Sequence, residues 1–186
     1  MIGPVPIHVD RDAQRQHVTD IATRLVADHG VSALTFRRVA DAAGSSTAIV
    51  STYFSDKRDL LLSTLRAAAT RTSVRFDATA AAGGGLLKSL EAWLPLDPER
   101  LTDWRVIVAF WGVAVTDPEL AQVQDGHVSR ARARVNTLLP HPDDALAGQV
   151  VALTLGIALQ AVFAPNGPAA RAQRTQLANG LTRLLD

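Results

Sequence analysis

Residues 34–61 read LTFRRVADAAGSSTAIVSTYFSDKRDLL, and this stretch decides the fold. It predicts two short helices joined by a tight turn, because Thr35 can cap the first helix and Gly44 can end it. The small side chains of Ala40 and Ala43 allow the two helices to approach closely. Two short helices that cross at a glycine-containing turn are typical of a helix-turn-helix.

The second helix of this pair is expected to present one side to the outside. Val50 and Phe54 match the apolar stripe of the first helix and should be buried against it. The other side chains are mostly small or carry hydroxyls, and such groups can enter a major groove and contact base edges, thymine methyls and phosphates. Those expected on or near the outer side are Thr47, Ala48, Ser51, Thr52 and Tyr53.

Positive charge is concentrated near this segment. Residues 1–75 hold ten Lys and Arg against seven Asp and Glu, whereas residues 76–186 hold nine against eleven. The net charge of the whole chain is only +1, which excludes a uniformly basic nucleic-acid binder. The cations of the segment could form an ordinary solvated face, but phosphate contact is favoured because non-specific DNA affinity depends on such neutralisation. These cations are Arg37, Arg38, Lys57 and Arg58.

Three residues of the expected DNA-contacting set could also have another role. Thr35 caps a helix in either case, and contact with DNA would be a second role. Tyr53 could pack against the following helix or contact the DNA backbone, and the second interpretation is slightly favoured. Ser46 lies in the capping stretch before the second helix and is included for that reason.

Helical periodicity continues through the rest of the chain. It predicts an amphipathic helix over 11–29 that ends at Gly30, and a long helix that begins after Asp56. The AAAGGG stretch at 80–85 is the clearest flexible break, and proline-containing breaks separate the helices that follow. Those five helices are expected over 86–94, 98–116, 118–139, 143–164 and 168–185.

The most apolar stretch, residues 145–165, has no charged side chain over 21 positions. A membrane span needs about 20 apolar residues, but polar residues interrupt this stretch and no aromatic or basic anchors flank it. A buried helix or a subunit interface is therefore favoured. A twofold partner would cover such a helix and would also present two copies of the outward-facing helix. We expect a homodimer and no membrane contact.

No catalytic, metal or cofactor constellation is found in the sequence. The absence of cysteine removes thiolate nucleophiles and cysteine-based metal sites, and it suits the cytoplasm. The five histidines have no zinc-site spacing, and Ser45 and Ser46 lie in no nucleophile elbow. The GGGLLKS stretch at 83–89 has the wrong glycine-to-lysine spacing for a phosphate loop. An enzyme is not expected.

The order and spacing of residues 30–60 resemble the DNA-binding signature of the TetR family. The family often has Tyr where this chain has Ser51, so a different base preference is expected there. Residues 93–123 are similar to the regulatory domain of betaine-pathway, choline-responsive repressors. The positions that match the signature are Gly30, Thr35, Arg37, Ala43, Gly44, Tyr53, Phe54, Lys57 and Leu60.

The resemblance implies an all-α protomer of nine helices that binds a palindromic operator in double-stranded DNA as a homodimer. Residues 1–10 would be an N-terminal arm, 11–55 the helix-turn-helix domain, and 56–186 the regulatory and dimerisation domain. A small-molecule effector would release a repressor from its operator, although an activator stays open. The alternative is a helical module that binds a small molecule or a partner and lacks operator recognition. The expected dimer contacts are Val150, Leu153, Ile157, Leu177 and Leu181.

Aromatic residues of the regulatory domain could be core or could form a ligand pocket, including a cage for a cation. The aromatic residues considered are Trp93, Trp104, Phe110, Trp111 and Phe163. His127 is expected in the core or an interface rather than at the effector. The expected ligand-lining set is Trp104, Ile107, Val108, Trp111 and Phe163.

Overall fold

The computed structural model describes residues 11–164 and 169–186, so the expected N-terminal arm lies outside the described residues. Across the described ranges the chain forms nine α-helices, one 3-10 turn and no strand, which confirms the predicted all-α protomer. The helices are α1 (Arg11–His29), α2 (Phe36–Ala42), α3 (Thr47–Tyr53), α4 (Lys57–Ala81), α5 (Gly85–Glu91), α6 (Pro98–Ala114), α7 (Pro118–Asn136), α8 (Asp144–Phe163) and α9 (Ala170–Leu185), and the 3-10 turn is Val31–Ala33.

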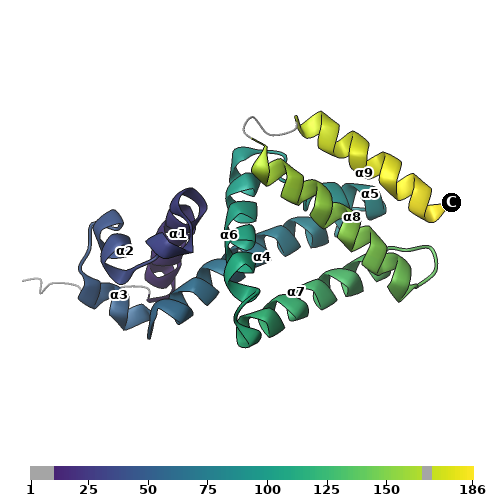
Figure 1. Ribbon diagram of the computed structural model, residues 1–186. Helices are drawn as coiled ribbons and strands as arrows, with labels where there is room; N and C mark the ends of the chain where they lie inside the picture. The colour runs from purple at the N-terminus through teal and green to yellow at the C-terminus, as the bar shows by residue number, and fades with distance from the viewer. Residues whose placement is uncertain (1–10, 165–168) are drawn as a thin grey trace, which may run out of the picture.

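Helix α4 runs between two groups of helices and contributes to an apolar core in each. Figure 1 shows α1, α2 and α3 gathered at one end and α5, α8 and α9 at the other, with α6 crossing α4 between them. Leu60 and Leu65 of α4 pack into a first core together with α1–α3 and Phe110 of α6. Phe76 of α4 packs into a second core with Trp104 of α6 and with α8 and α9. Both α4 and α6 therefore join the two ends of the molecule.

The turn between α2 and α3 is closed by backbone hydrogen bonds, as the sequence predicts. Gly44 takes a positive φ of 61°, a conformation that glycine adopts without steric cost. The Gly44 N–H donates to the Asp41 carbonyl at 3.2 Å, and the Ser45 N–H donates to the Ala40 carbonyl at 3.0 Å. This pair of bonds is a Schellman motif, which satisfies carbonyls that the helix end would otherwise leave free.

The start of each helix around this turn is capped by a side chain. Thr35 accepts a hydrogen bond from the Arg38 N–H at 3.2 Å, which confirms its predicted capping role. Ser46, rather than its neighbours, caps α3 by accepting from the Ile49 N–H at 3.3 Å. Asp56 caps α4 in the same way through the Asp59 N–H at 2.8 Å. Local sequence therefore determines where all three helices begin.

The AAAGGG stretch is an ordered turn, and the expectation of a flexible break there is wrong. Gly83 has a φ of 78°, and its N–H donates to the Ala80 carbonyl at 3.0 Å. The Gly84 N–H donates to the Thr79 carbonyl at 3.0 Å, which completes a second Schellman motif. Helix α5 begins at the next residue. The glycines serve as the closing turn of α4 and leave no linker.

Helix α8 is the apolar helix expected near the C-terminal end. Its length and composition would allow it to cross a membrane, and 39% of its most apolar 18-residue window is buried inside the protomer. Its N-cap is Asp143, which accepts hydrogen bonds from two N–H groups of the first turn. The helix therefore leaves much apolar surface outside the protomer core.

Most of the expected dimer contacts lie inside the protomer. Val150 and Leu177 are 0% exposed, and Ile157 and Leu181 are at most 5% exposed. They are buried because α8 and α9 pack on each other and on the second core within one chain. The prediction that these four side chains contact a second subunit is therefore wrong. The exposed positions of α8 after its first turn are Gln149, Ala152, Gln160 and Phe163.

Candidate nucleic-acid interface and ligand cavity

Helix α3 presents a continuous exposed face, as predicted. Val50 and Phe54 are 0% and 1% exposed and hold the other face against the first core. Thr35 and Tyr53 are half-buried, and Tyr53 packs against that core. The expected DNA-contacting residues that are exposed are Arg37, Arg38, Ser46, Thr47, Ala48, Ser51, Thr52 and Lys57.

The exposed hydroxyls of α3 are arranged to act as hydrogen-bond acceptors. The Ser51 hydroxyl donates to the Ala48 carbonyl at 2.9 Å, and the Thr52 hydroxyl donates to the Ile49 carbonyl at 2.7 Å. Each oxygen keeps lone pairs that face outward and can accept from a base amino group. Ser51 is short, so this position offers no phenol to reach a phosphate.

Ile49 is an exposed apolar residue on α3 that the sequence analysis missed. Its side chain is 45% exposed, although most large aliphatic residues of the first core are fully buried. The buried stripe of α3 consists of Val50 and Phe54, four positions apart, and Ile49 lies about 100° around the helix from Val50, which is the signal that could have identified it. An exposed Ile on this face suits contact with a thymine methyl group.

Two arginines of α1 hold the C-terminal end of α3. Arg11 donates from Nη2 to the Thr52 carbonyl at 3.1 Å, and Arg15 donates from Nε to the Tyr53 carbonyl at 3.3 Å. The guanidinium of Arg15 also lies 4.8 Å from the ring centre of Phe54. Cations there satisfy free carbonyls and oppose the negative end of the helix dipole. The orientation of α3 therefore depends on α1.

Arg58 is engaged within the protein, so its expected phosphate contact is not supported. It donates to the Asp117 carboxylate at 2.7 Å and to Glu119 at 2.8 Å. The hydrogen bond from Arg58 holds the pKa of Asp117 below its usual range, and the same contact raises the pKa of Arg58. Asp117 also caps α7, so this pair fastens the start of α4 to the turn between α6 and α7.

A cavity of about 100 Å³ lies among α4, α6, α7 and α8. All three tryptophans of the chain line it, and Trp104 and Trp111 meet edge to face with ring centres 6.3 Å apart. The Trp104 indole donates to the Trp93 carbonyl, whereas the buried Trp111 Nε1 has no hydrogen-bond partner among the described residues. The lining is completed by aliphatic and polar side chains of the four helices.

Only part of the expected ligand-lining set meets at this cavity. Trp104, Ile107 and Trp111 line it. Val108 is half-buried against the second core instead, and Phe163 is 69% exposed at the end of α8. The periodicity of α6 selected the correct face but could not separate cavity from core. His127 lines the cavity, contrary to the preference for core or interface.

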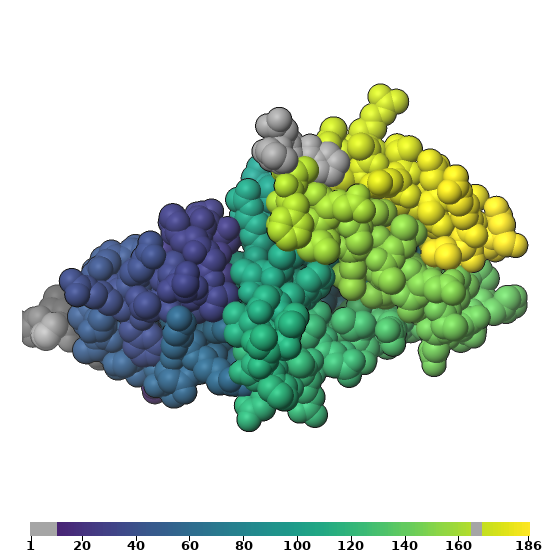
Figure 2. All heavy atoms as spheres, viewed as in Figure 1, coloured from purple at the N-terminus to yellow at the C-terminus, as the bar shows by residue number. Residues whose placement is uncertain are grey.

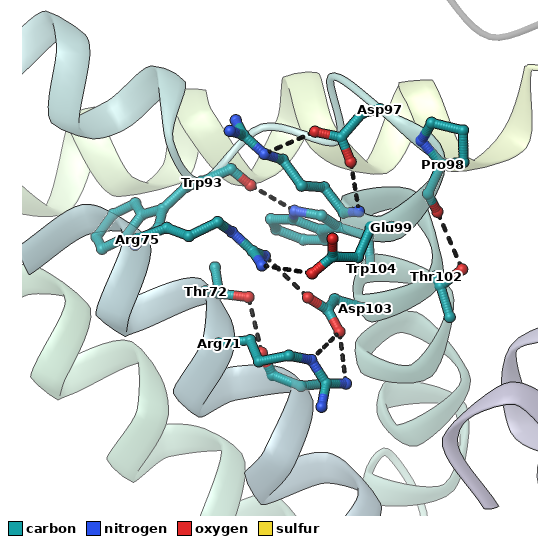
Figure 3. A network of polar contacts seen from close by, with 12 residues as sticks. Arg71, Thr72, Arg75, Trp93, Asp97, Pro98, Glu99, Thr102, Asp103 and Trp104 are labelled. Carbon is teal, nitrogen blue, oxygen red and sulfur yellow. Dashed lines mark hydrogen bonds and ion pairs between the residues drawn. The ribbon is translucent and has the colours of Figure 1, made fainter. Parts of the chain in front are cut away.

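A buried carboxylate connects the cavity wall to the rest of the molecule. Asp103 is 1% exposed and adjoins Trp104 in the sequence. Figure 3 shows the arginines of α4 reaching it: Arg71 at 2.6 Å from Nη2 and Arg75 at 2.8 Å from Nη2. Arg71 also lies 3.6 Å from Asp20 of α1. A chain of ionic contacts therefore runs from α6 through α4 to α1.

Two family profiles match consecutive parts of the chain. Residues 18–64 match the profile of bacterial regulatory proteins of the tetR family. Residues 84–186 match the C-terminal domain of BetI-type transcriptional repressors, and this match alone covers more than half of the chain. The two matches are consecutive and do not overlap.

Individual relatives agree with these profiles. The chain is 28% identical over 184 residues to the HTH-type transcriptional regulator BetI of Burkholderia mallei (strain NCTC 10229), which covers 95% of this chain and 80% of that protein. It is 33% identical over 101 residues to the HTH-type transcriptional repressor AcnR of Corynebacterium diphtheriae, a match over 54% of this chain and 50% of that one.

Two solved structures share the fold. A transcriptional regulator from Rhodococcus sp. Rha1 superposes with a TM-score of 0.82 at 23% identity, over 92% of this chain and 95% of that one. A regulator from Saccharomonospora viridis in complex with choline superposes with a TM-score of 0.76 at 22% identity, over 92% of this chain and 96% of that one. At these identities the likeness extends to the fold and to nothing finer.

Proposed function

We propose that this chain, which belongs to the TetR family of bacterial regulatory proteins and is a DNA-binding transcriptional regulator, represses transcription as a homodimer. A small molecule releases this homodimer from a palindromic operator. The observation that carries this proposal is the exposed face of α3, where small hydroxyl and methyl groups lie beside Arg37 and Arg38. Arginines at that place can neutralise phosphates while α3 reads bases in the major groove.

The proposed partner subunit packs on the open faces of α8 and α9. Ala152 is exposed on α8, and Phe163 at its end is 69% exposed. An added Cβ at Gly156 would meet no atom within 4 Å, so a second helix has room to approach there. A twofold dimer would cover this apolar surface and place two α3 helices about 34–36 Å apart, one turn of B-DNA. Operator binding implies a location with the chromosome, in the cytoplasm.

Effector response is proposed to pass from the cavity to the DNA-binding end through α4 and α6. Trp104 lines the cavity, and its neighbour Asp103 is bonded to Arg71 and Arg75 of α4. A ligand that binds more tightly to a state with displaced α6 would move α4 and change the spacing between the two α3 helices. The effect requires different affinities for the two states, since equal affinities shift no equilibrium.

Fluorescence anisotropy on labelled DNA from upstream of the protein's own gene tests the DNA-binding part. We expect specific binding that weakens with salt, because cation-phosphate contacts release counterions. Arg37→Ala with Arg38→Ala should reduce affinity and lower the slope of log K against log salt by about 4 per dimer, because each subunit loses two phosphate contacts. The matched control is Lys88→Ala with Arg105→Ala, two exposed cations of α5 and α6 that lie outside α2, α3 and the proposed partner faces of α8 and α9.

The outcomes of this titration separate the two interpretations of the chain. Equal losses in both double variants, or binding that does not change with salt, would contradict operator recognition by the α2–α3 face. If no DNA is bound while small molecules still enter the cavity, the alternative of a helical ligand-binding module without operator recognition is correct.

A further inference from the structure

The charged side chains that line the tryptophan cavity are all basic. Among the described residues, its lining includes Arg130, Arg134 and His127 and no Asp or Glu. The aromatic part is formed by the three tryptophans. Such a lining provides an apolar chamber with hydrogen-bond donors at one side, which is complementary to a ligand that carries acceptors.

Arg130 is positioned for a ligand by its own helix. Its Nη2 lies 3.1 Å from His127 Nδ1, and its guanidinium folds back over Gly126. An added Cβ at Gly126 would lie 3.3 Å from Arg130 Nη1, so the glycine leaves the space that this conformation uses. Arg134 is already bound to Asp77 at 2.9 Å, whereas Arg130 forms no ion pair within the described part of the chain.

The field at His127 is positive. The charged groups around it are Arg66 and Asp77 of α4 and Arg130 and Arg134 of α7, which line a groove beside the cavity. Burial is the main cause that lowers the pKa of His127, and the charges of Arg130 and Arg66 lower it further. An added anion would offset this repulsion, and an added cation would increase it.

We propose that the effector is an organic anion with an apolar body, whose carboxylate binds at the Arg130–His127 pair and whose ring lies among the tryptophans. The unpartnered Trp111 Nε1 is a further donor to an acceptor on the ligand. The inference rests on the proposed role of the cavity as effector site. A quaternary ammonium, such as the choline bound by one structural neighbour, would meet Arg130 here with no carboxylate in the described cavity lining.

Calorimetric and fluorescence titrations of the full chain with four probes test this proposal. Phenylacetate supplies the anion, phenylacetamide its neutral analogue, phenethylamine its cationic analogue, and choline a quaternary cation. All three tryptophans line the cavity, so intrinsic fluorescence reports on it directly. We expect phenylacetate to bind at least about tenfold more tightly than the other three, as charge-assisted hydrogen bonds allow.

Two variants on the same helix locate the carboxylate. Arg130→Gln should remove the preference of phenylacetate over phenylacetamide, whereas Arg132→Gln, an equal change of charge at an exposed position outside the cavity lining, should keep it. Phenylacetate should also bind more tightly at pH 5.5 than at pH 8, because a bound carboxylate favours protonation of His127, whose pKa is lowered in the free chain. His127→Gln should lose this pH dependence.

Several results would overturn the proposal. One is tighter binding of phenethylamine or choline than of phenylacetate, and another is an equal effect of the two arginine variants. A third is no fluorescence change with any probe at 10 mM, roughly the limit for a weak monocyclic ligand. The titrations use no DNA, so their failure is distinct from a failure of operator binding. If the chain binds phenylacetate but no operator, the inference about the ligand holds and only the proposed repressor function is wrong.

Discussion

His127 and Asp103 show what single polar side chains do inside an otherwise apolar regulatory domain. Asp103 is buried and held by two arginines, so its charge is compensated where it lies. His127 is half-buried and has arginines as neighbours, so its neutral form is favoured. The first residue fastens helices together, whereas the second is sensitive to the charge of whatever enters the cavity.

The free energy of unfolding of the chain should decrease in acid because of His127. Its pKa is lower in the folded chain than in the unfolded one, where it is about 6.5, so the unfolded state binds the proton more strongly. The contribution of neutral His127 is therefore present above pH 6.5 and lost as the pH falls below it. Urea unfolding at pH 8.0 and 5.5 should show a smaller acid loss in His127→Gln than in the wild type. His17→Gln, at an exposed position of α1, is the control and should lose as much stability in acid as the wild type. An equally small acid loss of stability in both variants would contradict the prediction.

Residues with local roles could be predicted from the sequence, and residues with distant partners could not. Thr35 and Asp56 cap helices because of the few residues that follow them, and the sequence shows those residues. Arg15 reaches Tyr53 and Asp103 reaches Arg71 across tens of positions. No periodicity specifies such pairs, since they arise only when helices pack. Arg58 was misassigned to DNA for the same reason.

At the scale of elements, glycine has opposite effects according to its place. Gly84 follows α4 where the chain turns directly into α5, and an added Cβ there would lie 2.7 Å from Thr79 Cγ2 and 2.9 Å from the Thr79 carbonyl oxygen. Gly112 lies within α6, is exposed, and has no atom within 4 Å of an added Cβ. Close packing against Thr79 therefore requires glycine at position 84 of the AAAGGG stretch, which the composition of the stretch does not show.

The two glycines should respond with opposite signs to the same substitution. Gly84→Ala should destabilise the chain by about 1–3 kcal/mol, because the backbone of Thr79 cannot yield without opening the turn. Gly112→Ala should stabilise it by about 0.5–1 kcal/mol, because alanine loses less conformational freedom in a helix. Chemical denaturation measures both. A stabilised Gly84→Ala variant would show that α5 does not follow α4 through this ordered turn.

For the molecule as a whole, the sequence predicts an all-helical protomer and its family. It does not predict correctly which face of α8 is buried within the chain. Composition identified α8 as a helix that needs cover on nearly all sides. It could not show that α9 of the same chain supplies part of that cover. Figure 2 shows α8 and α9 packed side by side, with atoms of both helices at the surface. The proposed dimer surface is therefore the face that α9 leaves open.

Ala152→Arg should disrupt the dimer and leave the protomer folded. Ala152 is exposed in the protomer, so the arginine meets solvent in a monomer but would be buried against a partner. We expect light scattering after size exclusion to give a dimer for the wild type and a monomer for the variant, with equal helical circular dichroism. Ala133→Arg, on the exposed face of α7, should remain dimeric. A dimeric Ala152→Arg variant would place the interface elsewhere.

The continuity of α4 has a mechanical consequence. The helix is unbroken over 25 residues and is fastened to α6 at Arg71 and Arg75. Leu65, against the cavity, lies about 9 Å from Arg71 along the axis, and Lys57 lies about 21 Å from it, at 1.5 Å per residue. If α4 turns as a stiff rod about Arg71, a sideways displacement at Leu65 becomes a roughly twofold larger displacement at Lys57. The contacts of Arg58 with Asp117 and Glu119 would have to move with it or break. In the proposed repressor, a ligand of modest size would thereby displace α3 by more than it displaces the cavity wall, and the two α3 helices of a dimer would no longer match the spacing of two DNA grooves.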